Sequence, residues 1–177
     1  MIFMIIEHDN KHFTKEEIIN TPERIKRFHK EWEDNTNFPN EKFKFTTFPN
    51  PGYDQMIILK NIDFASMCSH HLLPFHGIAH IGYIPDKLIC GISKLARVVD
   101  KFASRPQEQE KVTQDVANFL QDKLKPKGVM VVMEAQHDCM RIRGVKKQNS
   151  VMVTSAITNV FRKKGVKEEF LQLIYHK

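Results

Sequence analysis

Two short groups of residues, far apart in the chain, contain side chains that zinc prefers as ligands. Residues 68–71 read Cys-Ser-His-His, and residues 137–139 read His-Asp-Cys. A Cys-x-x-His pair brings a thiolate sulfur and an imidazole nitrogen together within one turn. Cys139 would complete a set of three ligands, which leaves a position for water, as in catalytic zinc sites. The sequence therefore indicates a Zn²⁺ site that can do chemistry.

The same residues fit a second interpretation, in which Cys68 and Cys139 are buried apolar thiols and the histidines beside them are incidental. Cys90 lies in an apolar run without a neighbouring histidine and is predicted to belong to the core. His76 and His80 are predicted to be structural or on the surface, because alternation along a strand would turn them elsewhere. Spacing alone leaves both interpretations open.

Two further features favour catalysis. His70 and His137 each lie beside a proposed ligand without being required as one, and imidazole near a metal site is suited to carry protons. Ser93 and Lys94 open a predicted helix, and Arg97 follows one turn later. Free N–H groups at a helix start favour phosphate when lysine and arginine lie beside them, although such residues are commonly just solvated.

Composition and charge limit the class of protein. A chain of 177 residues with net charge +6 fits one domain and favours anionic partners. The charge is spread along the chain, so a small polyanion fits at least as well as nucleic acid. Met1–Ile6 is shorter than a signal-peptide core, and three cysteines do not suggest a disulfide framework. We expect a cytoplasmic protein without a membrane or nucleic-acid partner.

The elements that must position these residues follow from local patterns. A capping box at residues 14–17 and Thr21-Pro22 both resemble helix starts, and residues 35–53 read as loop. Strands are expected over about 56–66, 77–84, 88–92, 129–135 and 151–161. Helices are expected from Ser93 to the Arg105-Pro106 interruption, then to about Leu124, and over 166–175. This order predicts an α+β fold with two helices on one face of an antiparallel sheet.

Several motifs together resemble the type I GTP cyclohydrolase family. They are residues 66–75 around the Cys-x-x-His pair, 91–97, 105–110, and 137–140 with Arg143-Gly144. The resemblance covers about residues 62–161 and extends back to residues 21–24. It implies a tunnelling fold, with an N-terminal helical segment over 1–55 and a catalytic domain over 56–177. It also implies a homo-oligomer, a decamer of two pentamers with active sites between subunits.

The resemblance implies a role for each motif residue. One zinc ion per subunit would be held by Cys68, His71 and Cys139, and GTP would be converted to formate and 7,8-dihydroneopterin triphosphate. His137, His70 and Ser93 would be catalytic. The residues expected to bind the substrate are Glu110, Gln109, Lys94, Arg97, Arg143, Arg24 and Arg27.

The chain also departs from the family pattern. Glutamate is common after the first cysteine, where this chain has Ser69, and Asp138 replaces a larger apolar residue. A different enzyme of the same fold is disfavoured by the complete metal triad, the two extra histidines and Glu110. Zinc deaminases are disfavoured because their Pro-Cys-x-x-Cys motif is missing from the sequence. A zinc-stabilised nucleic-acid module would instead need a fourth ligand and a continuous basic surface.

Overall fold

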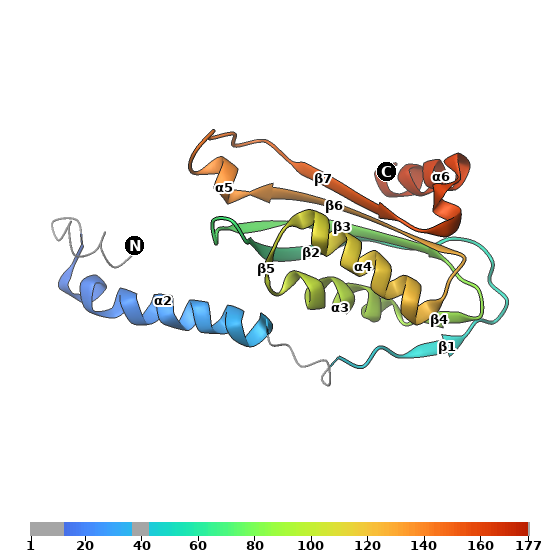
Figure 1. Ribbon diagram of the computed structural model, residues 1–177, viewed down its shortest axis with the longest axis horizontal. Coiled ribbons are helices and arrows are strands. Elements are labelled where there is room, and N and C mark those ends of the chain that lie inside the picture. Colours follow the sequence, from blue (N-terminus) through green and yellow to red (C-terminus); the bar gives the residue numbers. More distant parts are fainter. Residues whose placement is uncertain (1–12, 37–42, 177) are drawn as a thin grey trace. The chain divides into compact units, whose positions relative to one another are not determined.

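The computed structural model describes residues 13–36 and 43–176 (Figure 1). The apolar run Met1–Ile6 and Pro39 therefore lie outside the described residues. Contacts divide the chain into residues 1–38 and residues 39–177, and each part is described by itself. The predicted division after residue 55 stays a prediction.

Residues 13–36 contain one helix, α2 (Lys15–Thr36), which begins where the capping box places it. The Thr14 hydroxyl and amide both donate to the Glu17 carboxylate, at 2.8 and 2.7 Å, and the Glu17 amide donates back at 3.2 Å. The prediction of a helix start at Thr21-Pro22 is wrong, because Pro22 lies inside α2. The capping box already satisfies the first turn, so α2 begins before Thr21 and contains Pro22 despite the loss of one backbone hydrogen bond and the crowding of the carbonyl four residues earlier.

A five-stranded sheet organises the rest of the chain, with strand order β5-β2-β3-β6-β7. Its strands are β2 (Ile57–Cys68), β3 (Pro74–Ile84), β5 (Pro106–Gln107), β6 (Gly128–His137) and β7 (Met152–Ile157). The long strands pair antiparallel, as predicted. The short β5 pairs parallel with the end of β2, so the sheet is mixed rather than purely antiparallel.

A second sheet pairs β1 (Thr47–Pro49) with β4 (Leu88–Cys90). β1 lies within the stretch that was expected to be loop, which is a correction to that prediction. Its three residues pair with β4 residues about 40 positions away, and local composition does not reveal such a partner. The predicted turn chemistry follows directly after β1, where the side-chain oxygen Oδ1 of Asn50 accepts from the Gly52 and Tyr53 amides.

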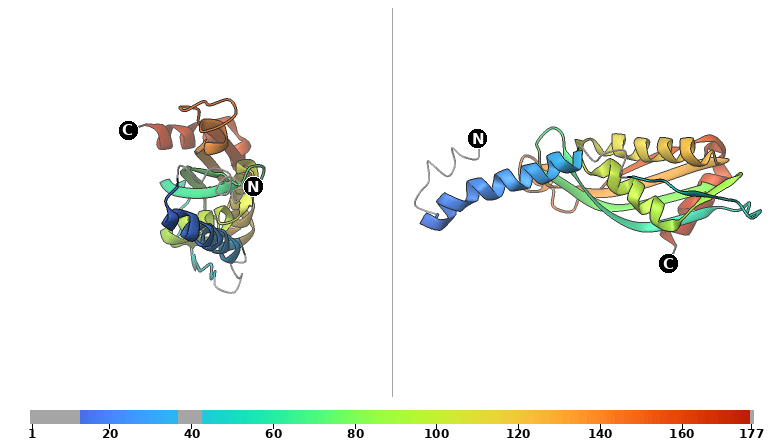
Figure 2. Two further views of the ribbon diagram at one scale, coloured as in Figure 1. Left: turned by 90° about the vertical axis from the view of Figure 1, so that its left-hand side faces the viewer. Right: turned by 90° about the horizontal axis from the view of Figure 1, so that it is seen from below.

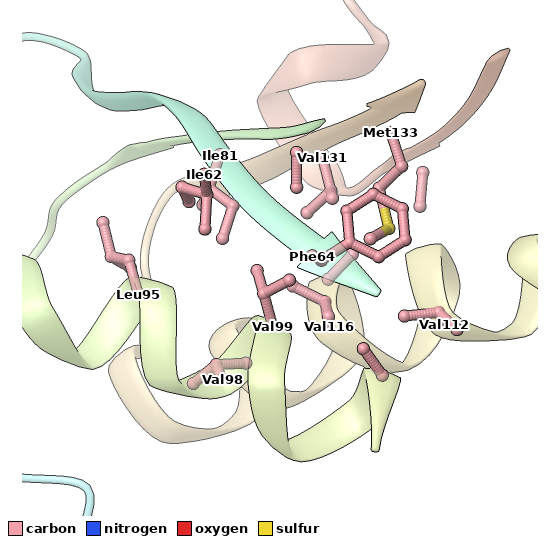
Figure 3. Close-up of a cluster of buried hydrophobic side chains, with 14 of the residues drawn as sticks. Ile62, Phe64, Ile81, Leu95, Val98, Val99, Val112, Val116, Val131 and Met133 are labelled. Atoms are coloured by element: carbon pink, nitrogen blue, oxygen red, sulfur yellow. The ribbon is translucent and has the colours of Figure 1, made fainter. Parts of the chain in front are cut away.

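Two helices cover one face of the large sheet, as predicted: α3 (Ile92–Ala103) and α4 (Gln109–Leu124). Figure 3 shows their apolar side chains, among them Leu95 and Val116, facing Ile62 and Phe64 of β2 and Val131 of β6. The α3 helix begins at Ile92 with Gly91 as its N-cap, so Ser93 lies inside the first turn and does not open the helix.

The opposite face of the sheet carries α6 (Lys164–Tyr175), which begins two residues earlier than predicted. Met130 and Val132 of β6 form a second apolar cluster with Phe170 and Ile174 of α6. Because side chains alternate along a strand, these residues lie on the face turned away from α3 and α4. Figure 1 shows α6 beside the start of β6 and the end of β7, and Figure 2 gives two further views of the same arrangement.

Two short elements remain, a 3-10 turn after β7 and a single helical turn after β6. The predicted strand over 151–161 is β7 followed by a 3-10 turn, η1 (Asn159–Arg162), so its second half is a correction. α5 (Asp138–Arg141) is a single turn after β6. Among the described residues, no helix is both long and apolar enough to cross a membrane.

The helices and the largely antiparallel sheet confirm the α+β class, and the tunnelling fold stays a prediction.

Candidate metal centre and its surroundings

The ends of three strands bring the proposed ligands together. Cys68 is the last residue of β2, His71 lies in the turn that leads to β3, and Cys139 lies in α5 directly after β6. The Cys68 carbonyl accepts from the Leu72 amide at 2.9 Å, which closes that turn. Phe75 pairs with His137, so the start of β3 and the end of β6 meet at the same edge of the sheet.

The ligand atoms of Cys68, His71 and Cys139 all lie within 4.8 Å of one another. His70 also approaches the sulfur: Cys68 Sγ lies 3.8 Å from His70 Nδ1 and 3.9 Å from His71 Nδ1. Within the described chain, however, only His71 completes a group with both cysteines. The structure therefore brings together the three residues that the sequence indicated as metal ligands.

The chemistry of this donor set fits a thiophilic divalent cation. Both cysteines are free thiols. Burial and the neighbouring Cys68 sulfur raise the pKa of Cys139. Two thiolates this close repel each other unless a cation lies between them, and zinc binding deprotonates its thiol ligands. The group is thus suited to Zn²⁺, with two sulfurs and one nitrogen.

His137 lies beside this group in a fixed orientation. Its ring stacks on Phe75 with a centroid distance of 4.5 Å and parallel planes. Its Nε2 lies 2.8 Å from the Gln109 side-chain oxygen. Burial lowers the His137 pKa, and the nearby Glu110 carboxylate opposes this effect by raising it. Glu110 is exposed at the start of α4 and acts on the same histidine that was predicted to be catalytic.

The Gln109 side chain determines which nitrogen of His137 carries the proton. Gln109 is 1% exposed, and its amide nitrogen donates to the Met133 and Met152 carbonyls at 3.0 Å each and to the Thr154 hydroxyl at 3.1 Å. Because the side-chain nitrogen of Gln109 donates these three bonds, the atom that faces His137 Nε2 is the side-chain oxygen, which can only accept. His137 Nε2 therefore donates, and Nδ1 remains free to exchange a proton.

Gln109 was expected to bind the substrate. Its side chain is buried and hydrogen-bonded to β6, β7 and His137, and the substrate-binding role stays a prediction. Its buried contacts come from β6 and β7, which lie far from α4 in the chain. No local pattern could have found these contacts.

The predicted phosphate-binding residues lie at different places. Ser93 and Arg97 are exposed on α3, whereas Lys94 is half-buried and donates to the Lys44 carbonyl at 2.8 Å. Arg143 is exposed and donates from its guanidinium to His71 Nε2 at 2.9 Å. It is therefore the cation that lies directly against the metal centre. Arg24 and Arg27, the other two arginines that were predicted to bind the substrate, are exposed on α2.

One interaction at this site was missed from the sequence. The Ser69 hydroxyl donates to the Glu108 carboxylate at 3.0 Å, and the same oxygen lies 3.7 Å from His70 Nε2. In the sequence Glu108 was named only as part of the motif at residues 105–110. The signal that could have found it was the absence of a glutamate at position 69, which leaves a place for a carboxylate from elsewhere.

The residues expected to lie away from the site do so. Cys90 packs against the main core, where burial raises its pKa. His76 is exposed on β3. His80 is 2% exposed and accepts from the Asn61 amide through Nδ1 at 3.4 Å. These three predictions are confirmed.

Comparison with known proteins gives one consistent result. The family model of GTP cyclohydrolase I matches residues 1–175. The GTP cyclohydrolase 1 of Wolinella succinogenes is 49% identical over 170 residues, which are 95% of this chain and 89% of that protein. The GTP cyclohydrolase 1 of Aquifex aeolicus is 48% identical over 161 residues, 90% of this chain and 85% of its own.

A more distant solved structure, the archaeosine synthase QueF-Like in the apo form, has a TM-score of 0.49 and 16% sequence identity, covering 58% of this chain and 92% of its own. The assignment depends on the sequence relatives alone. Because the family model spans nearly the whole chain, and relatives close to half identical match most of it, this chain belongs to the GTP cyclohydrolase I family of enzymes.

Proposed function

We propose that this chain is a zinc-dependent enzyme that hydrolyses the guanine imidazole ring of GTP to formate and 7,8-dihydroneopterin triphosphate. The observation that carries this proposal is the grouping of Cys68, His71 and Cys139 within 4.8 Å, with His137 held beside them at the same sheet edge. A metal site and a histidine proton carrier are the two parts that hydrolytic ring opening requires.

Cys68, His71 and Cys139 would hold the zinc ion. When bound, zinc lowers the pKa of water and supplies a hydroxide-like nucleophile near neutral pH. The His71 Nε2 atom accepts a hydrogen bond from Arg143 at 2.9 Å, and its Nδ1 atom lies 3.9 Å from Cys68 Sγ.

His137 would protonate the guanine imidazole ring, which makes C8 electrophilic and allows the C8–N9 bond to break. The hydrogen bond from His137 Nε2 to Gln109 leaves Nδ1 as the nitrogen that exchanges this proton. Stacking on Phe75 fixes the ring plane, so proton transfer requires no reorientation of His137. His70 and Ser93 would then assist the ribose rearrangement and closure of the new ring.

Glu110 would select guanine. Glu110 lies in the first turn of α4, directly after Gln109, whose side chain bonds His137. It would accept hydrogen bonds from the guanine N1–H and 2-amino group. Adenine offers neither donor there, so both hydrogen bonds to the carboxylate would be lost, and a hydrogen bond to a charged group contributes about 1.5–3 kcal/mol.

The triphosphate would bind the cations around this centre. Lys94, Arg97 and Arg143 are proposed for this role, with Arg24 and Arg27 contributed by another subunit. Guanidinium groups bind phosphate through paired hydrogen bonds, which suits Arg143, because it is exposed beside His71. The decameric assembly and the cytoplasmic location stay predictions from the sequence.

Purified, zinc-loaded protein incubated with GTP tests the proposal. Formate release and the rise of pterin absorbance should follow each other in time. His137→Ala should abolish turnover while zinc remains bound, because His137 is not a ligand. Turnover of GTP by His137→Ala at the wild-type rate, or no formate from the wild-type protein, would contradict the proposal.

A further inference from the structure

The Glu108 carboxylate connects two segments beside the metal centre. Its Oε1 accepts from the Ser69 hydroxyl at 3.0 Å and lies 3.7 Å from His70 Nε2. The backbone aligns these groups independently, because Cys68 pairs with Gln107 in the parallel β2–β5 contact and the Ser69 amide donates to the Gln107 carbonyl at 3.3 Å. Glu108 is thus placed next to His70 by the fold and not by a chance rotamer.

The Glu108 side chain accepts a hydrogen bond from Ser69 instead of capping the helix that it precedes. It is the N-cap residue of α4, yet within the described chain its side chain makes no capping hydrogen bond. An N-cap carboxylate usually accepts from the first helical amides. The Ser69 hydrogen bond is also the main cause that lowers the Glu108 pKa, so the group is ionised at neutral pH.

His70 needs such a partner. Its side chain is 67% exposed, so packing does little to hold the ring. Its Nδ1 faces Cys68 Sγ at 3.8 Å, and its Nε2 faces Glu108 at 3.7 Å. A carboxylate at the Nε2 end favours the tautomer with the proton on Nε2 and holds the ring in one orientation.

We propose that Glu108, held by Ser69, is a positioning residue that orients His70 beside the metal centre. The proposal rests on the function proposed above, in which His70 assists the later steps of the reaction. Glu108 does not touch the reacting atoms in this scheme. It acts only through His70.

The position of Ser69 offers a sharp test, because a carboxylate at residue 69 would occupy nearly the same place as that of Glu108. The variants are Glu108→Gln, Glu108→Ala, and Glu108→Ala combined with Ser69→Glu. Lys111→Gln is the matched control, since it changes one charge in the first turns of the same helix. All are loaded with zinc and assayed for kcat, KM for GTP and metal content.

Glu108→Gln and Glu108→Ala are expected to lower kcat by ~10–100-fold, the usual effect of removing a group that orients a site residue. KM should change by less than about threefold, and the zinc content should not change. Adding Ser69→Glu to Glu108→Ala should restore kcat to within about threefold of wild type, and Lys111→Gln should match wild type. A merely structural role for Glu108 would not be rescued from position 69.

Crystal structures of the zinc-loaded wild type and Glu108→Ala give a readout that is independent of activity. One His70 ring orientation, with Nε2 toward residue 108, is expected in the wild type, and a rotated or disordered ring in the variant. An unchanged ring, wild-type kcat in Glu108→Gln, or failure of the Ser69→Glu rescue in a folded, zinc-loaded protein would overturn the proposal. If the wild type itself released no formate, the proposed function would fail, and the two crystal structures would still decide whether Glu108 orients His70.

Discussion

Replacing Gln109 with leucine tests how His137 is held. Leucine has nearly the same size but cannot accept the 2.8 Å hydrogen bond from His137 Nε2. A hydrogen bond to a group that becomes charged contributes about 1.5–3 kcal/mol. At about 1.4 kcal/mol for each factor of ten in rate, its loss should lower kcat by ~10–150-fold.

The same change also lowers stability. Gln109 makes four side-chain hydrogen bonds, to His137, Met133, Met152 and Thr154. At about 0.5–1.5 kcal/mol each, their loss reduces the free energy of unfolding by about 2–6 kcal/mol. Thr154→Val is the matched control, because it removes one bond to Gln109 and leaves the bond to His137 in place.

The assay measures kcat for formate release, zinc content and urea unfolding for each variant. Thr154→Val should lose stability and keep kcat within about threefold, since the His137 tautomer is retained. Gln109→Glu should keep more activity than Gln109→Leu, because it still offers an oxygen to Nε2. If folded, zinc-loaded Gln109→Leu turned over at the wild-type rate, the tautomer argument would be refuted.

Three further predictions follow from other parts of the structure. Cys139→Ser should lose zinc and turnover together, whereas Cys90→Ala, a change in the core, should keep both, as measured by metal analysis and formate release. Glu110→Gln should lower kcat/KM for GTP by ~10–100-fold because the guanine donors lose a charged acceptor, and unchanged kcat/KM would remove Glu110 from recognition. Burial lowers the His80 pKa, so the unfolded chain binds a proton that the folded chain excludes, and stability present above pH ~6.5 is lost as the pH falls below it. His80→Gln should weaken this loss in urea unfolding at pH 7.5 and 5.5, and an equal loss in both proteins would contradict the assignment.

The sequence predicted most of what depends on local pattern. The capping box at Thr14, the apolar stripe of α3 and the long strands of the sheet are visible in the spacing of side chains, because amphipathic periodicity reflects burial directly. The grouping of Cys68, His71 and Cys139 was predicted only in part from local pattern. The Cys-x-x-His pair is local, but spacing alone left a buried-thiol interpretation open, and the family motifs favoured Cys139 as the third member.

The errors have a common physical cause. Residues 14–17 and Thr21-Pro22 each have the form of a helix start. Local pattern does not show that the helix that begins at the first of them continues through Pro22. The Ser69–Glu108 bond and the Gln109 bonds to β6 and β7 join residues that only the sheet brings together. Local sequence patterns indicate which secondary structure a side chain favours, but they do not identify the distant group that it contacts.

X-ray absorption at the zinc edge of the purified holoenzyme tests the central claim most directly. With Cys68, Cys139 and His71 as the ligands, the spectrum should show two sulfurs at about 2.3 Å, one imidazole nitrogen at about 2.0–2.1 Å and one light atom from solvent. The sulfur signal should fall to one in Cys139→Ser protein that retains any metal. A second imidazole, contributed by His70, or a third sulfur would mean a closed site with no place for the water that ring opening requires, and would contradict the account.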